Sequence, residues 1–118
     1  MKICFLDKTT FEYDFADKFS PMLRGAETIL INLSKYISLL GHEVFVFNNC
    51  RNSIISKNYH WNNINKLNNK NNFFDVAVAN ADANLLNLIN AKKKIVLSYS
   101  LQPIEKFIRK KQLLINFD

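Results

Sequence analysis

The chain has 118 residues, enough for one domain with a buried core, and it carries a formal net charge of +6. Hydrophobic residues make up 48% and charged residues 22%, which is the balance of a globular domain. No apolar run approaches the ~20 residues that a membrane-spanning helix needs. The start of the chain also has too few apolar residues for a signal peptide, so we expect a cytoplasmic protein.

The first half of the chain predicts a strand, a helix and a second strand. Residues 3–6 are a short continuous apolar run, typical of a strand buried on both faces, and the run ends at Asp7. After a long loop, apolar residues on one stripe predict a helix over residues 25–40, which Gly41 can end. Residues 43–47 predict the next buried strand. The stripe consists of Ala26, Ile29, Leu30, Leu33, Ile37 and Leu40.

The second half predicts further strands separated by helices. Tyr59, Trp61 and Ile64 indicate a short third strand, with Ile64 and Leu67 beginning a helical turn. Residues 73–79 predict a fourth strand. Asp82 is placed to cap a helix that runs to about Asn90. Residues 94–98 predict a fifth strand, and Pro103 can open a last helix over residues 104–114. In the helix capped by Asp82, the residues expected to face inward are Leu85, Leu86 and Ile89.

Buried strands that alternate with helices predict an α/β fold with a doubly wound parallel sheet, Rossmann-like in type. In such sheets ligands bind beyond the carboxyl ends of the strands, near the point where the strand order reverses. The loop after Leu6 and the residues around Asn80 and Ser100 should therefore share one rim.

Charge and cysteine content limit the partners. The basic clusters at residues 92–94 and 106–111 are not interleaved with aromatic residues, as a single-strand binding groove would be, so we expect no nucleic acid partner. A solvated basic face and peripheral contact with an anionic membrane both remain open. Cys4 and Cys50 lack the spacing and the nearby histidines of a metal site, so we expect no metal and no cofactor. Cys4, within an apolar run, is expected to be a buried thiol.

Four segments, taken together, resemble a known family. They are KICFLD, RGAETILINLSKYISLLGHEVFVF, FDVAVAN and KKIVLSYS, and they resemble the N-terminal half of a GT-B glycosyltransferase of family 4. Members of that family typically show a Gly-Gly-Ala-Glu helix start, a helix that closes in Gly-His-Glu-Val, and a strand led by Asp-Val. The resemblance covers nearly the whole chain and is densest over residues 25–46.

The resemblance implies substrate-binding roles at the helix start and on the rim. Gly25 and Glu27 lie where free backbone N–H groups and the helix dipole favour a diphosphate, although Glu27 also suits a purely structural first-turn position. Arg24 stands where many members have the first glycine. Asn80 and Ser100 stand where many members have histidines. We take all five as substrate-binding candidates and none as catalytic.

The same family binds its nucleotide-sugar donor mainly through a C-terminal domain, which no segment here matches. We therefore expect residues 1–118 to be a single acceptor-side domain of a retaining glycosyltransferase, with the donor-binding domain absent and the isolated chain inactive. The implied partners are a nucleotide-sugar donor and a sugar or lipid-linked acceptor, in cell-surface polysaccharide or glycolipid synthesis. The alternative is a non-catalytic α/β module that contacts a partner protein or an anionic surface through its basic face.

Overall fold

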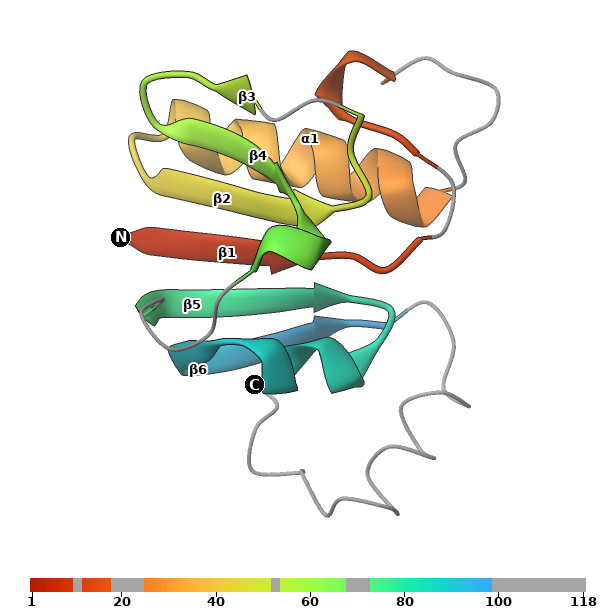
Figure 1. Ribbon diagram of the computed structural model, residues 1–118. Coiled ribbons are helices and arrows are strands. Elements are labelled where there is room, and N and C mark those ends of the chain that lie inside the picture. The colour runs from red at the N-terminus through yellow and green to blue at the C-terminus, as the bar shows by residue number, and fades with distance from the viewer. Residues whose placement is uncertain (10–11, 18–24, 52–53, 68–72, 99–118) are drawn as a thin grey trace.

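A computed structural model describes residues 1–9, 12–17, 25–51, 54–67 and 73–98 (Figure 1). The strands in these ranges are β1 (Lys2–Leu6), β2 (Glu43–Asn48), β3 (Ile54–Ile55), β4 (Tyr59–Asn63), β5 (Phe73–Asn80) and β6 (Asn90–Leu97). The helical elements are α1 (Gly25–Leu39) and three short 3-10 helices, η1 (Phe15–Asp17), η2 (Ile64–Lys66) and η3 (Ala83–Leu88).

The strands form one sheet in the order β3-β4-β2-β1-β5-β6. Five of them, from β4 to β6 in that order, run parallel, which confirms the predicted α/β fold with a Rossmann-like sheet. The exception is β3, a two-residue strand that pairs antiparallel with β4 at one edge. β3 was not predicted, because two residues are too few to carry a periodic pattern.

The central strand β1 supplies both halves of the core. Its side chains alternate between the two faces of the sheet, so Ile3 and Phe5 pack toward α1 while Cys4 and Leu6 pack toward η3. Figure 1 shows α1 on one face and η2 and η3 on the other. The predicted buried thiol is confirmed, since Cys4 is fully enclosed.

The prediction for the buried face of α1 was partly wrong. Leu30 is buried as expected, and Leu33 and Ile37 pack against the core, but Ile29 and Leu40 are exposed. The residues of α1 that are buried are Glu27, Leu30, Ile31, Ser34 and Ser38. Each serine hydroxyl donates to the backbone carbonyl three residues earlier, at 3.1 Å for Ser34 and 2.6 Å for Ser38. Two small serine side chains, each hydrogen-bonded within the helix, therefore lie against the sheet. The hydrophobic pattern had predicted only larger apolar side chains on that face.

The second half of the chain differs from prediction mainly in its helices. Trp61 lies in β4 as expected, and Ile64 opens η2, which confirms the helical turn predicted to begin there. Asp82 does cap the next helix, since its carboxylate accepts from the backbone N–H of Asn84 at 3.0 Å, but that helix is a short 3-10 helix. It is short because Asn90, predicted as its end, already pairs with Phe73 as the first residue of β6. The predicted helix at residues 104–114 lies outside the described residues.

Candidate functional site

The strand order reverses between β1 and β5. These strands are adjacent and parallel, yet the chain leaves β1 toward α1 and β2 and leaves β5 toward η3 and β6 (Figure 1). The connections diverge there, so the carboxyl ends of β1 and β5 stand at the position where parallel sheets bind ligands. Leu6 pairs with Ala79, which brings the residues after each strand together as the sequence predicted.

A buried carboxyl group stands at the end of β1. Asp7 accepts hydrogen bonds from the Tyr13 hydroxyl, from the Thr9 hydroxyl at 3.1 Å and from the Thr9 backbone N–H at 3.3 Å. Burial raises the pKa of the Asp7 carboxyl, the bonds from Tyr13 and Thr9 oppose that rise, and the negative charge of Glu27 adds to it. Burial likewise raises the pKa of the Tyr13 phenol, helped by the negative charge of Asp7. Burial at the end of β1 therefore destabilises the charged forms of both Asp7 and Tyr13.

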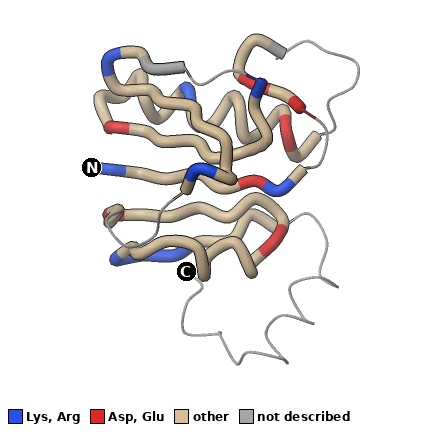
Figure 2. Tube along the Cα trace, in the orientation of Figure 1, with Lys and Arg blue, Asp and Glu red and all other residues tan. Residues whose placement is uncertain are grey.

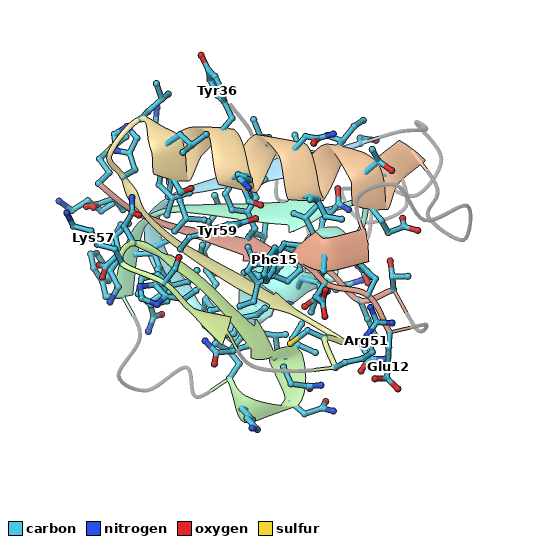
Figure 3. The ribbon with its side chains drawn as sticks, turned by 90° about the horizontal axis from the view of Figure 1, so that it is seen from above. Glu12, Phe15, Tyr36, Arg51, Lys57 and Tyr59 are labelled. Atoms are coloured by element: carbon cyan, nitrogen blue, oxygen red, sulfur yellow. The ribbon has the colours of Figure 1, made fainter. Side chains whose placement is uncertain are left out.

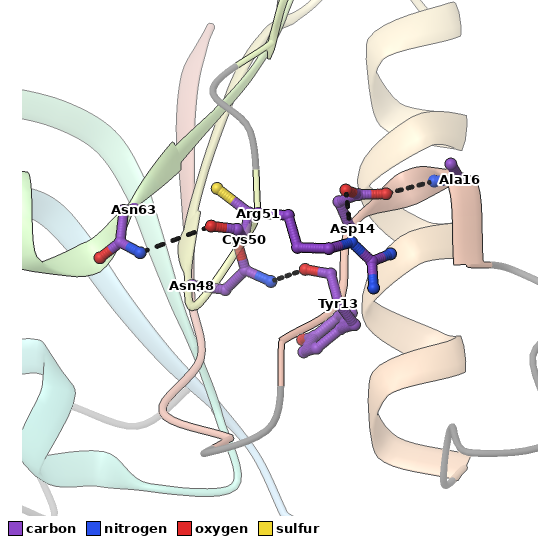
Figure 4. A network of polar contacts seen from close by, with 7 residues as sticks. All are labelled: Tyr13, Asp14, Ala16, Asn48, Cys50, Arg51 and Asn63. Atoms are coloured by element: carbon purple, nitrogen blue, oxygen red, sulfur yellow. Dashed lines mark hydrogen bonds and ion pairs between the residues drawn. The ribbon is translucent and has the colours of Figure 1, made fainter.

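The loop that carries Tyr13 is fixed to the end of β2 (Figure 4). The side-chain amide of Asn48 donates to the Tyr13 carbonyl oxygen at 2.8 Å, and Arg51 Nε lies 3.8 Å from the Asp14 carboxylate. Asp14 also accepts from the Ala16 backbone N–H at 2.9 Å. Two chain segments that follow neighbouring strands therefore hold each other, which keeps Tyr13 in place against Asp7.

The end of β5 is joined to the start of α1. Asn80 is almost fully buried, and its amide donates to the carbonyl oxygen of Ala26 in the first turn of α1 at 3.2 Å. The next residue, Ala81, has a φ of 66°, in the left-handed region that alanine seldom occupies. Strain of this kind is concentrated at functional sites. Among the predicted residues, Asn80 thus lies at the reversal point beside a strained backbone.

A hollow opens on the η3 face of the sheet at the same carboxyl ends. Its larger part has a volume of about 390 Å³ and its smaller part about 200 Å³. Both parts are bordered by Lys8, Ile64 and Asn65. The larger part is also lined by Asp82, Asn84, Leu85 and Leu88, and the smaller by Asp7, Thr9 and Asn49.

The lining of the hollow combines two kinds of surface. Asparagine amides, which both donate and accept hydrogen bonds, stand beside the apolar side chains of Ile64, Leu85 and Leu88. Among the described residues of this lining Lys8 is the one cation, and the carboxyl groups of Asp7 and Asp82 offset its charge. Such a surface suits a neutral ligand with many hydroxyl groups better than a polyanion.

Two of the predicted substrate-binding residues, Arg24 and Ser100, lie outside the described residues. Gly25 is the first residue of α1 and is exposed. Glu27 is fully buried in the first turn of that helix, so its carboxylate does not reach the surface in this arrangement. The resemblance therefore pointed to α1, whereas the hollow lies on the other face of the sheet.

The residues missed were those that line the hollow and support it, chiefly Asp7, Lys8, Tyr13 and Asp82. One signal was available for Asp7, because a polar residue directly after a buried parallel strand falls on the ligand-binding edge. Tyr13 had no such signal, since its contact with Asp7 depends on how an irregular loop folds back. Within the described ranges, no group of three or more histidine, cysteine, aspartate or glutamate side chains is arranged to hold a metal ion.

Known proteins offer no direct guide to this site. None of the protein-family models, curated proteins or solved structures compared with the chain matches it. No helix among the described residues is long and apolar enough to cross a membrane.

Proposed function

We propose that this α/β domain is the acceptor-side domain of a nucleotide-sugar-dependent retaining glycosyltransferase with a GT-B architecture. In this proposal the hollow receives the sugar acceptor, and the α1 N-terminus faces the diphosphate of the donor, which a second domain holds. The acceptor would belong to cell-surface polysaccharide or glycolipid synthesis.

The observation that carries the proposal is the position and lining of the hollow. It lies beside the reversal of strand order, and its amides and carboxyl groups can bond hydroxyl groups while Ile64, Leu85 and Leu88 cover the C–H face of a sugar ring. A second support is the Asn80–Ala26 hydrogen bond, which couples the edge of β5 to the α1 terminus that the resemblance associates with the donor.

Chemical-shift mapping of the isotopically labelled chain tests the proposal. Mono- and disaccharides should shift the amide signals of residues 7–9 and 82–85, and nucleotide diphosphates should act at the first turn of α1. Asp82→Ala and Asn84→Ala should weaken the response to sugars, whereas Lys66→Gln, an exposed residue outside the lining, should leave it unchanged. Mixed with donor and acceptor, the chain alone should transfer no sugar.

Two results would contradict this function. One is the absence of any sugar response at the hollow in a folded chain. The other is a response confined to the basic strand β6, which would favour the non-catalytic binding module instead.

A further inference from the structure

Exposed apolar side chains gather at the amino ends of the strands, opposite the hollow. Leu39 is 74% exposed and Leu40 is 60% exposed where α1 ends, Met1 precedes β1, and Phe73 begins β5 with 54% of its surface exposed. Tyr36, one turn earlier in α1, is 61% exposed and points away from the molecule (Figure 3). Ile29 and Leu88, also exposed, lie elsewhere.

The same end of the molecule is positively charged. Lysines and the chain's amino group lie at the starts of β1 and β6 and at the turn before β4, and Figure 2 shows them along one edge together with fewer carboxylates. Lys57 is exposed in that turn, and Figure 3 shows it at the same end as the close of α1.

The carboxylates at this end, Asp75 and Glu43, are fewer than its cations, and Asp75 is held within the protein. Asp75 accepts from the Lys2 backbone N–H at 2.8 Å and lies 3.9 Å from the Lys92 ammonium. Glu43 lies 3.8 Å from the His60 ring nitrogen. The described part of this end therefore presents a surplus of positive charge to solvent.

Hydrogen bonds hold this surface in a fixed arrangement. The side-chain amide of Asn58 donates to the carbonyl oxygens of Ser38 at 2.7 Å and His42 at 3.0 Å, which joins the turn before β4 to the end of α1. The Met1 amino group lies 2.9 Å from His42 Nδ1, which joins the start of β1 to the connection between α1 and β2. The apolar and basic side chains are thus displayed from a framework that needs no rearrangement to bind.

We propose that this amino edge docks on an anionic phospholipid surface. Leu39, Leu40 and Phe73 would enter the boundary between headgroups and acyl chains, while Lys57 would contact the phosphates. Apolar side chains that stand apart from one another between lysine side chains suit the headgroup layer of a membrane. A stable protein partner would instead require about 800 Å² of complementary surface on each side. The inference depends only on the amino edge and is independent of the activity proposed for the hollow.

Co-sedimentation of the 118-residue chain with vesicles tests the proposal. The chain should bind vesicles of phosphatidylcholine mixed with phosphatidylglycerol and should not bind phosphatidylcholine alone, and added salt should weaken the binding. Lys57→Gln should lower the partition coefficient about five-fold, from about 1 kcal/mol per cation. Leu39→Ser combined with Leu40→Ser should lower it about ten-fold or more.

Matched variants separate this surface from general charge and hydrophobicity. Ile29→Ser removes an exposed apolar residue at the other end of α1, and Lys66→Gln removes an exposed cation beyond β4. Both should bind the mixed vesicles about as well as the unchanged chain, with melting curves confirming that every variant is folded. Failure of the unchanged chain to bind mixed vesicles, or an equal loss in the control variants, would overturn the proposal. So would a dimer that Leu39→Ser dissociates without any vesicle binding.

Discussion

At the scale of single residues, Asp7 shows how burial and ionisation oppose each other at the proposed ligand edge. Its pKa lies above the ordinary 3.8, chiefly because burial disfavours the charged form. The folded protein therefore holds a proton that the unfolded chain releases, so the contribution of Asp7 to stability is fully present below about pH 3.8 and is lost as the pH rises through the folded-state pKa.

We expect Asp7→Asn to remove this pH dependence. Asparagine stays neutral, so the melting temperature of the variant relative to the unchanged protein should rise between pH 4 and pH 7.5. Thermal unfolding followed by circular dichroism across that range measures the difference. A melting-temperature difference, variant minus unchanged protein, that stays constant or falls as the pH rises would show that Asp7 is not the group responsible.

Tyr13→Phe provides the matched control. It keeps the ring, which packs edge-on to Trp61 at 6.2 Å between centroids, and removes the hydroxyl that donates to Asp7. Without that donor the pKa of Asp7 should rise further, so the loss of stability with rising pH should become larger in this variant.

The sequence predicted Asn80 and the edge on which it lies, because a buried apolar run fixes where a parallel strand ends. It did not predict Tyr13 or the lining of the hollow. Those positions depend on irregular segments whose folding is decided by individual hydrogen bonds, such as Asn48 to Tyr13, and no periodic pattern records such bonds.

At the scale of elements, the backbone conformation favours glycine at the carboxyl end of α1 but not at its amino end. Gly41 follows the helix with a φ of +100°, where an L side chain is strained even though a Cβ would meet no heavy atom within 4 Å. Gly25 is already the first residue of the helix, and a Cβ there would also meet nothing within 4 Å among the described residues.

Gly41→Ala should lower the free energy of unfolding by about 1–2 kcal/mol. Gly25→Ala should leave it unchanged or raise it by up to about 1 kcal/mol, because alanine favours a helix. Urea denaturation of both variants measures these values. An equal loss in Gly25→Ala would mean that chain conformation requires glycine there, whereas a stable Gly25→Ala that loses its response to nucleotide diphosphates would indicate close approach of a ligand.

The boundaries of α1 were predictable from Gly25 and Gly41, but its buried face was predictable only in part. Leu30, Leu33 and Ile37 of the predicted stripe do pack against the core. Packing also placed Ser34 and Ser38 inside, which a pattern of large apolar residues does not predict. That η3 is a short 3-10 helix was likewise not predictable from the sequence. Its length is limited by the early start of β6 at Asn90, which depends on pairing with β5.

At the scale of the whole molecule, the order of the strands predicts a gradient of stability. β1 is paired on both sides, and its residues from Ile3 to Leu6 are buried, whereas β6 pairs with β5 and its side chains are exposed or half-buried. Backbone amides of β1 should therefore exchange with deuterium more slowly than those of β6. Exchange measured by mass spectrometry or NMR checks this, and equal protection in the two strands would contradict it.

The position of Cys4 in the central strand β1 determines when its thiol can react with a reagent. Burial raises the pKa of both cysteine thiols, so each stays protonated and unreactive in the folded chain. Cys4 can meet a labelling reagent only when β1 separates from its neighbours, whereas Cys50, just beyond β2, needs only a local opening of its loop. The rates at which a coloured disulfide reagent modifies the two thiols would therefore time global unfolding and local loop opening separately, without any engineered label.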